Sequence, residues 1–172
     1  VVFYGGADGS QTYNDTWEYD GTNWTEITPA DSPSYRNGFG MAFFESMNRT
    51  FLFSGYTGSA LASDLWKYDG VNWEYVYPYE TPRARLAPVM AYDEARGETV
   101  LFGGSGLDLY NDTWVWDGIG WVEKSPTTVP DSRYGAMGAW DSAREKVVMF
   151  GGQAGSTYLN DTWEWDGTDW SE

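Results

Sequence analysis

The stretch Asn160-Asp161-Thr162-Trp163-Glu164-Trp165-Asp166-Gly167 carries the pattern from which the fold can be argued. Its two tryptophans fall on one face of an extended strand, and the Thr and Glu that alternate with them fall on the other. The closing Asp-Gly pair is typical of a hairpin turn between antiparallel strands. The stretch therefore predicts a half-buried strand and a tight turn into the next strand.

The same pattern occurs four times along the chain. Its first tryptophans are Trp17, Trp66, Trp114 and Trp163, at spacings of 49, 48 and 49 residues, and a second Trp follows each by seven residues. A fixed period of this length indicates a tandem structural repeat.

Two further motifs complete the repeat. An apolar run ends on a pair of small residues: Gly5-Gly6, Ser54-Gly55, Gly103-Gly104 and Gly151-Gly152. Three of the units also contain Pro-x-x-Arg before small and apolar residues, with Arg36, Arg85 and Arg133. Each unit is expected to form four strands, within residues 1–29, 30–78, 79–126 and 127–172, and the first unit lacks its first strand.

The composition excludes several kinds of chemistry. The 172 residues include 11 Trp, 13 Tyr and 8 Phe but neither Cys nor His. Disulfides, thiolate zinc sites and Ser-His-Asp triads are thereby excluded within the chain. Catalysis would depend on carboxylates, Tyr, Lys or an oxygen-bound metal, and no compact cluster of metal-ligand spacing occurs. We therefore expect no catalytic residue, no metal and no cofactor.

The charge of the chain limits its partners. The formal net charge is −16, from 10 Lys and Arg against 26 Asp and Glu. Long-range repulsion argues against binding to nucleic acid or to an anionic membrane. No apolar run reaches the length of a membrane span, so membrane insertion is not expected.

The repeat resembles the kelch repeat, in the variant found in galactose-oxidase-type propellers of bacterial and other extracellular proteins. The resemblance covers the whole chain and rests on the small-residue pair, the Asn-Asp-Thr-Trp stretch and the second Trp. It implies an all-β propeller of four-stranded antiparallel blades, and a secreted or cell-surface location. The second unit departs most, with Ser54 in place of Gly and Leu65 in place of Thr.

The missing first strand leaves three arrangements open. The chain is a segment of a larger propeller, a four-bladed ring with one thin blade, or a chain whose ring a second copy completes. The third arrangement implies a homo-oligomer.

The arginines of the Pro-x-x-Arg motif are the candidate binding residues. The resemblance implies that Arg36, Arg85 and Arg133 lie near the central channel, where arginines of some kelch proteins contact acidic peptides. The alternative is a structural role, with each arginine paired to a neighbouring Asp or to loop carbonyls. The recurring Asp15, Asp64, Asp112 and Asp161 are the corresponding structural candidates.

Asn48 is the candidate glycosylation site. It is one of five Asn-x-Ser/Thr sequons, and three of the others belong to the repeated stretch. Asn48 is expected at a hairpin tip, where a glycan would be most accessible.

The function expected from these observations is a non-catalytic binding or scaffold module that presents loops to a protein or carbohydrate partner. One alternative is an enzyme with glycosidase-like carboxylate chemistry. Another is a purely structural repeat in a multi-chain assembly. The copper-oxidase activity of galactose oxidase is excluded, because its copper needs His ligands and its radical cofactor needs a Cys, and this chain has neither residue.

Overall fold

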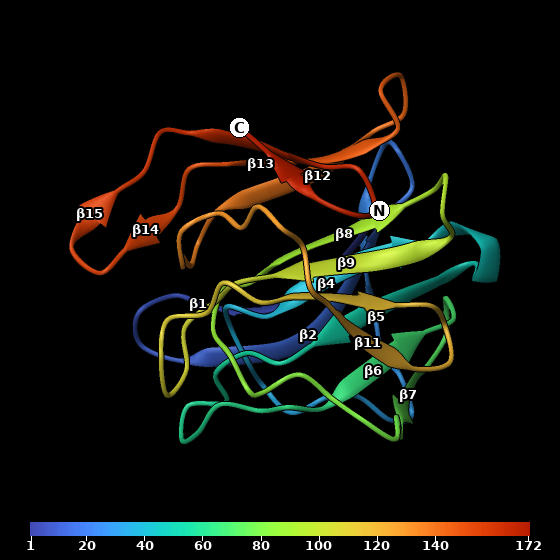
Figure 1. The fold of residues 1–172 in the computed structure, drawn as a ribbon. Coiled ribbons are helices and arrows are strands. Elements are labelled where there is room, and N and C mark those ends of the chain that lie inside the picture. The colour runs from blue at the N-terminus through green and yellow to red at the C-terminus, as the bar shows by residue number, and fades with distance from the viewer.

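The protein, described here over residues 1–172 by a computed structural model, consists of antiparallel β-sheets (Figure 1). It contains no α-helix, and its one 3-10 helix is η1 (Glu45–Met47). No helix is long and apolar enough to cross a membrane. The expectation of an all-β chain is thus confirmed.

Three sheets have four strands and one has three. The first sheet contains β1 (Val2–Ala7), β2 (Thr12–Tyr19) and β3 (Trp24–Ile27). The second contains β4 (Gly40–Phe44), β5 (Arg49–Phe53), β6 (Leu65–Tyr68) and β7 (Trp73–Val76). The third contains β8 (Val89–Asp93), β9 (Glu98–Phe102), β10 (Thr113–Trp116) and β11 (Trp121–Lys124). The fourth contains β12 (Met137–Asp141), β13 (Lys146–Phe150), β16 (Thr162–Trp165) and β17 (Trp170–Ser171).

Each sheet lies within one repeat unit, and its strands follow one another in chain order. Two segments that follow a small-residue pair form additional strand pairing. β2 is eight residues long and pairs with β1 beyond the Gly pair, across an irregularity between Tyr4 and Gly6. The loop 153–159 forms a small hairpin of β14 (Gln153–Ala154) and β15 (Thr157–Tyr158).

The Asp-Gly turns form as the sequence predicts. In the fourth sheet, Asp166 Oδ1 accepts the backbone N–H groups of Thr168 at 2.8 Å and Asp169 at 2.9 Å. Gly167 has a φ of +95°, a conformation that a side chain disfavours. The turn pairs Trp165 with Trp170 across the hairpin.

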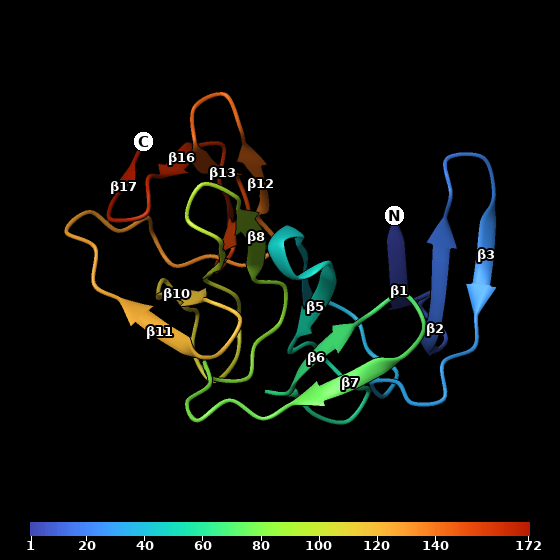
Figure 2. The ribbon, with the colours of Figure 1, turned by 90° about the vertical axis from the view of Figure 1, so that its right-hand side faces the viewer.

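The four sheets follow one another along an arc, with the first and fourth sheets at its ends (Figure 2). A tryptophan from the fourth strand of one sheet packs on the sheet before it. Trp73 lies 5.2 Å from Tyr4 between ring centroids, and Trp170 lies 5.0 Å from Phe102. Their indole N–H groups donate to Thr16 and Thr113, each at 3.0 Å. Aromatic side chains make up half of the 22 buried hydrophobic residues, and several of them pack between neighbouring sheets.

The departures of the second unit have visible consequences. Leu65 stands where the first and third units have the accepting Thr, and the indole nitrogen of Trp121 is buried without a partner. Ser54 takes a glycine-like φ of +68°. Its hydroxyl shares its proton between the backbone carbonyls of Ala62 and Arg85 and accepts the backbone N–H of Arg85 at 2.7 Å. These bonds offset the strain of a non-glycine residue at this position.

Substitution of a leucine in the core should be costly. Leu101 is fully buried in a cluster with Phe44, Phe51 and Trp116, whereas Leu107 is 87% exposed. Leu101→Ala should lower the free energy of unfolding by about 2–5 kcal/mol through lost burial and a cavity, measured by urea denaturation. The matched control Leu107→Ala should change it by less than about 0.5 kcal/mol. Equal effects of the two substitutions would contradict the packing described.

Candidate functional site

The candidate arginines lie at one end of the sheets, and their side chains turn inward. Arg36, Arg85 and Arg133 have 1%, 0% and 1% of their surface exposed. Each lies in the segment ahead of the first strand of its sheet. They do not share one ligand pocket, because each side chain binds within its own sheet.

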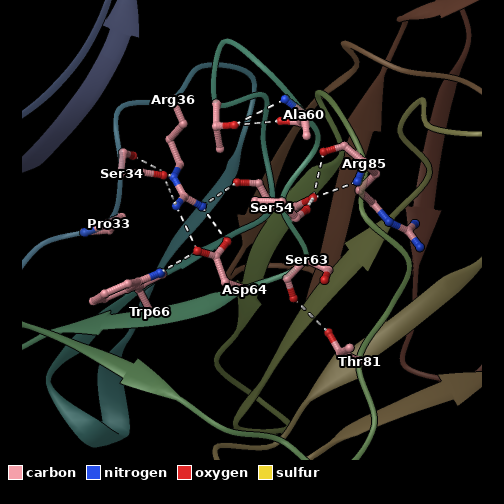
Figure 3. Close-up of polar contacts among 12 residues, drawn as sticks. Pro33, Ser34, Arg36, Ser54, Ala60, Ser63, Asp64, Trp66, Thr81 and Arg85 are labelled. Atoms are coloured by element: carbon pink, nitrogen blue, oxygen red, sulfur yellow. Dashed lines mark hydrogen bonds and ion pairs between the residues drawn. The ribbon is translucent and has the colours of Figure 1, made fainter.

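Each guanidinium binds an aspartate in a bidentate ion pair, and Figure 3 shows the pair of Arg36 and Asp64. Arg36 donates to Asp64 at 2.6 and 2.8 Å, and Arg133 binds Asp161 with the same two distances. Arg85 binds Asp112 at 2.7 and 2.8 Å. The indole N–H of the tryptophan two residues later donates to the same carboxylate, as Trp66 does to Asp64 at 2.7 Å.

Backbone carbonyls accept two further N–H groups of each guanidinium. The Nε–H of each arginine donates to the carbonyl two residues earlier, at 3.0 Å. One terminal nitrogen also donates to the first residue of the small pair in the same sheet, which is Ser54, Gly103 or Gly151. The structural role considered for these arginines therefore matches the geometry, whereas ligand contact by them remains a prediction.

Arg36 and Arg133 lower the pKa values of their partners, Asp64 and Asp161. The Arg133 hydrogen bond, with help from Trp163, overcomes desolvation and lowers the pKa of Asp161 to about 2. Burial by itself raises the pKa of Asp64, but the bonds from Arg36 and Trp66 outweigh it and leave the pKa below its usual value. Both carboxylates are therefore held in the charged form.

A hollow of about 520 Å³ lies among the loops at the same end of the second and third sheets. Its lining includes Leu61 from the loop before β6, Arg83 from the segment before β8, and Leu107 and Tyr110 from the loop after β9. Arg83 is exposed and has no acidic partner. The hollow thus combines a free cation with apolar side chains.

Arg85 contacts two lining residues of this hollow, the backbone carbonyl of Arg83 and the ring of Tyr110. Its guanidinium carbon lies 4.6 Å from the centre of the Tyr110 ring, a distance typical of a cation–π contact. The Tyr110 hydroxyl oxygen is buried without a hydrogen-bond partner in the chain. Arg85 therefore positions a residue that lines the hollow.

Arg83 was not among the residues singled out from the sequence. The available signal was its departure from the repeat, because Ser34 and Asp131 stand at the equivalent positions of the second and fourth units. A residue that occurs in only one unit is not part of the repeat motif, so the motif does not identify it. Loops that differ between repeats are where binding residues concentrate.

Asn48 is exposed, with a left-handed φ of 52°, at the turn between η1 and β5. The hydroxyl-bearing residue of its sequon, Thr50, is buried in β5. Glycosylation at Asn48 remains a prediction.

The structure brings together no group of three or more acidic side chains that could hold a metal ion. A smaller hollow of about 300 Å³ lies between the first strands β4, β8 and β12, and the carboxylates lining it are those of Glu45 and Glu94. Both residues are exposed. These are the carboxylates to which the enzymatic alternative would apply.

Comparison with known proteins gives no identification: no protein-family model and no curated protein sequence matches the chain.

Removal of one buried arginine should destabilise the fold. Arg133→Gln leaves the Asp161 carboxylate without its counter-charge, so the free energy of unfolding near pH 7 should fall by about 3 kcal/mol. Arg83→Gln is the matched control and should leave stability nearly unchanged. Denaturant unfolding measures both. A folded Arg133→Gln variant of unchanged stability would contradict the structural role of this ion pair.

The same pair predicts an acid dependence of stability. The pKa of Asp161 is lowered from 3.8 to about 2 on folding, so its contribution is present above the unfolded value and is lost as the pH falls. The free energy of unfolding should therefore decline between about pH 4 and about pH 2 more steeply in the native chain than in Asp161→Asn. Equal slopes in a pH series of urea titrations would contradict this.

Proposed function

We propose that the chain is a segment of a kelch-type β-propeller that acts as a non-catalytic binding or scaffold module. The repeat motifs support the kelch assignment. The arc of sheets, with each fourth-strand tryptophan packed on the sheet before it, supports the propeller. The hollow lined by the first strands β4, β8 and β12 supports an inner position for those strands.

The two end faces of the arc support its continuation by other sheets. Trp24 of the first sheet is 50% exposed, whereas its equivalents Trp73 and Trp170 are each 2% exposed. Phe150 of the fourth sheet is 54% exposed, whereas its equivalent Phe102 is 1% exposed. Large apolar patches of this kind mark surfaces that pack against another element. Further blades or a second copy would cover them.

The observation that carries the binding role is the hollow around Arg83. Its volume of about 520 Å³ falls within the range of ligand sites. Of the seven arginines and three lysines, all except Arg49 and Arg83 have an acidic partner within 4.0 Å. Arg83 is therefore the one free cation at the loop end of an otherwise acidic chain.

The lining indicates the chemistry of the ligand. Leu61, Leu107 and the Tyr110 ring would pack against an apolar or sugar surface, and Arg83 would bind a carboxylate. A protein segment or a glycan that carries an acidic group meets both requirements. Such a ligand suits an extracellular or cell-surface protein.

Defined libraries test this function. We expect the purified chain to select ligands with an acidic group from a glycan array or from a peptide display library. Arg83→Gln should weaken their binding about tenfold or more, because it removes a charge-assisted hydrogen bond. Leu107→Ser should weaken it through lost apolar contact.

The matched control is Arg49→Gln. Arg49 is the other arginine without an acidic partner, and it begins β5 at the end of that strand away from the loops. This variant should bind as the native chain does. Ligands that bind Arg83→Gln and Arg49→Gln equally well, or the absence of any ligand in both screens, would overturn the proposed site.

A further inference from the structure

A hollow of about 270 Å³ lies between the second and third sheets. Its lining includes Arg49 at the start of β5, Lys67 in β6 and Trp116 at the end of β10. Two of these residues are cations, and no acidic residue lines the hollow. In a chain with a net charge of −16, this hollow is therefore a site where positive charge predominates.

Trp116 brings an unused hydrogen-bond donor to this hollow. It is 0% exposed, and its indole nitrogen has no hydrogen-bond partner in the chain. A buried N–H group without an acceptor is unfavourable, because it has lost its hydrogen bond to water. An acceptor atom in the hollow would remove that cost.

The preceding pair of sheets shows which contact is missing. Tyr68 stands at the position of Trp116 in the second unit, and its hydroxyl donates to Glu18 of the first sheet at 3.0 Å. The second sheet has Lys67 at the position of Glu18. An ammonium group can only donate, so Lys67 cannot accept the indole N–H of Trp116. Two donors thus line the hollow where the preceding pair of sheets has a donor and an acceptor.

Lys67 keeps donors for a ligand although it has an acidic neighbour. Its ammonium nitrogen lies 3.2 Å from Glu74 Oε2, but the Glu74 side chain is 71% exposed, and such surface pairs contribute little. An ammonium group has three N–H donors, so two remain. Arg49 also lines the hollow, with one N–H on the carbonyl of Asn48. The ligand contact is assigned to Lys67, because its position supplies the acceptor in the preceding pair of sheets.

The rest of the lining is apolar and limits the size of the ligand. Met47, Phe51 and Val76 contribute these apolar side chains. The turn at Gly118 lies close to Met47, since a Cβ added to this glycine would be 2.9 Å from the Met47 methyl carbon. The volume is below the range of about 300–1,000 Å³ that holds drug-sized ligands. The hollow therefore suits a small molecule with an anionic end and an apolar body.

We propose that this hollow binds a small organic monocarboxylate, held by the Lys67 ammonium and the Trp116 indole N–H. One carboxylate oxygen accepts the indole N–H, and the other accepts an ammonium N–H in a charge-assisted hydrogen bond. The aliphatic part packs on Met47, Phe51 and Val76. This site is separate from the loop-end hollow and does not depend on the ligand proposed there.

The indole N–H of Trp116 itself reports occupancy. The native 172-residue protein is titrated with sodium isobutyrate at constant ionic strength and followed by ¹H–¹⁵N NMR. We expect a saturable downfield shift of the Trp116 indole resonance, because a hydrogen bond to a carboxylate deshields the proton. Trp165 is an internal control, since its indole nitrogen is also buried without a partner but Val115 stands at the position of Lys67 on the facing sheet. The Trp165 resonance should not move.

A charge-matched pair of lysine variants tests the role of Lys67. Lys67→Gln should weaken isobutyrate binding about tenfold, because it removes a charge-assisted hydrogen bond. The matched control is Lys124→Gln. The Lys124 side chain is 32% exposed, against 34% for Lys67, and it pairs with Glu98 outside the hollow. This variant should bind isobutyrate as the native chain does, and equal weakening by the two substitutions would overturn the proposal.

Two analogues test the chemistry of the ligand. Isobutyramide has the same shape without the charge and should leave the Trp116 resonance nearly unshifted. Formate has the charge without the apolar body and should bind about tenfold more weakly than isobutyrate, through lost apolar burial. A Trp116 resonance that does not respond to isobutyrate, or that responds equally to isobutyramide or to formate, overturns the proposal.

Discussion

The buried arginine of each complete repeat joins two sheets, and the order of the array depends on it. The backbone of Arg133 is held by the third sheet: its carbonyl accepts the Gly104 N–H at 2.7 Å, and its N–H donates to the Tyr110 carbonyl at 3.1 Å. Its side chain belongs to the fourth sheet through Asp161 and Gly151. A buried ion pair adds little net stability, but loss of one partner is costly. The pair therefore fixes which segments meet and in what register.

Aromatic packing between sheets contributes the net stabilisation that the buried ion pairs do not. Each sheet contacts mainly its neighbours, so stability accumulates from sheet to sheet, as in other repeat proteins. Trp73 and Trp170 are nearly fully buried because each has a preceding sheet to pack on, whereas Trp24 has none. The end sheets are consequently the least protected parts of the array. The first sheet lacks two stabilising features: packing contacts on its outer face, and the strand whose arginine would pair with its aspartate.

The strands and their order could be predicted from the sequence because their causes are local. Alternation of Trp163 and Trp165 with polar residues defines a strand, and the following Asp-Gly fixes the turn. The direction of the arginine side chains could not be predicted. The repeat spacing identified Arg85 but did not show whether its guanidinium binds Asp112 or an external ligand. That choice depends on tertiary packing, which places Asp112 beside it over 27 residues of sequence. Arg83 could not be predicted as a site residue for another reason. It does not recur in the other units, so the repeat pattern does not identify it.

The ion pairs also shape the surface that remains for function. The chain has a net charge of −16, and eight of its ten cations are paired to acids, so acidic side chains outnumber free cations by far. Such a surface repels anionic partners at long range and confines their binding to sites with a free cation or a buried donor set. Arg83 is a cation of that kind among the loops. Asp15 is the converse case, a carboxylate whose buried Oδ1 atom has no donor in the chain. Both residues stand where the pattern of the repeat is broken: Arg83 does not recur, and the first sheet lacks the arginine that pairs with Asp64, Asp112 and Asp161 in the other sheets.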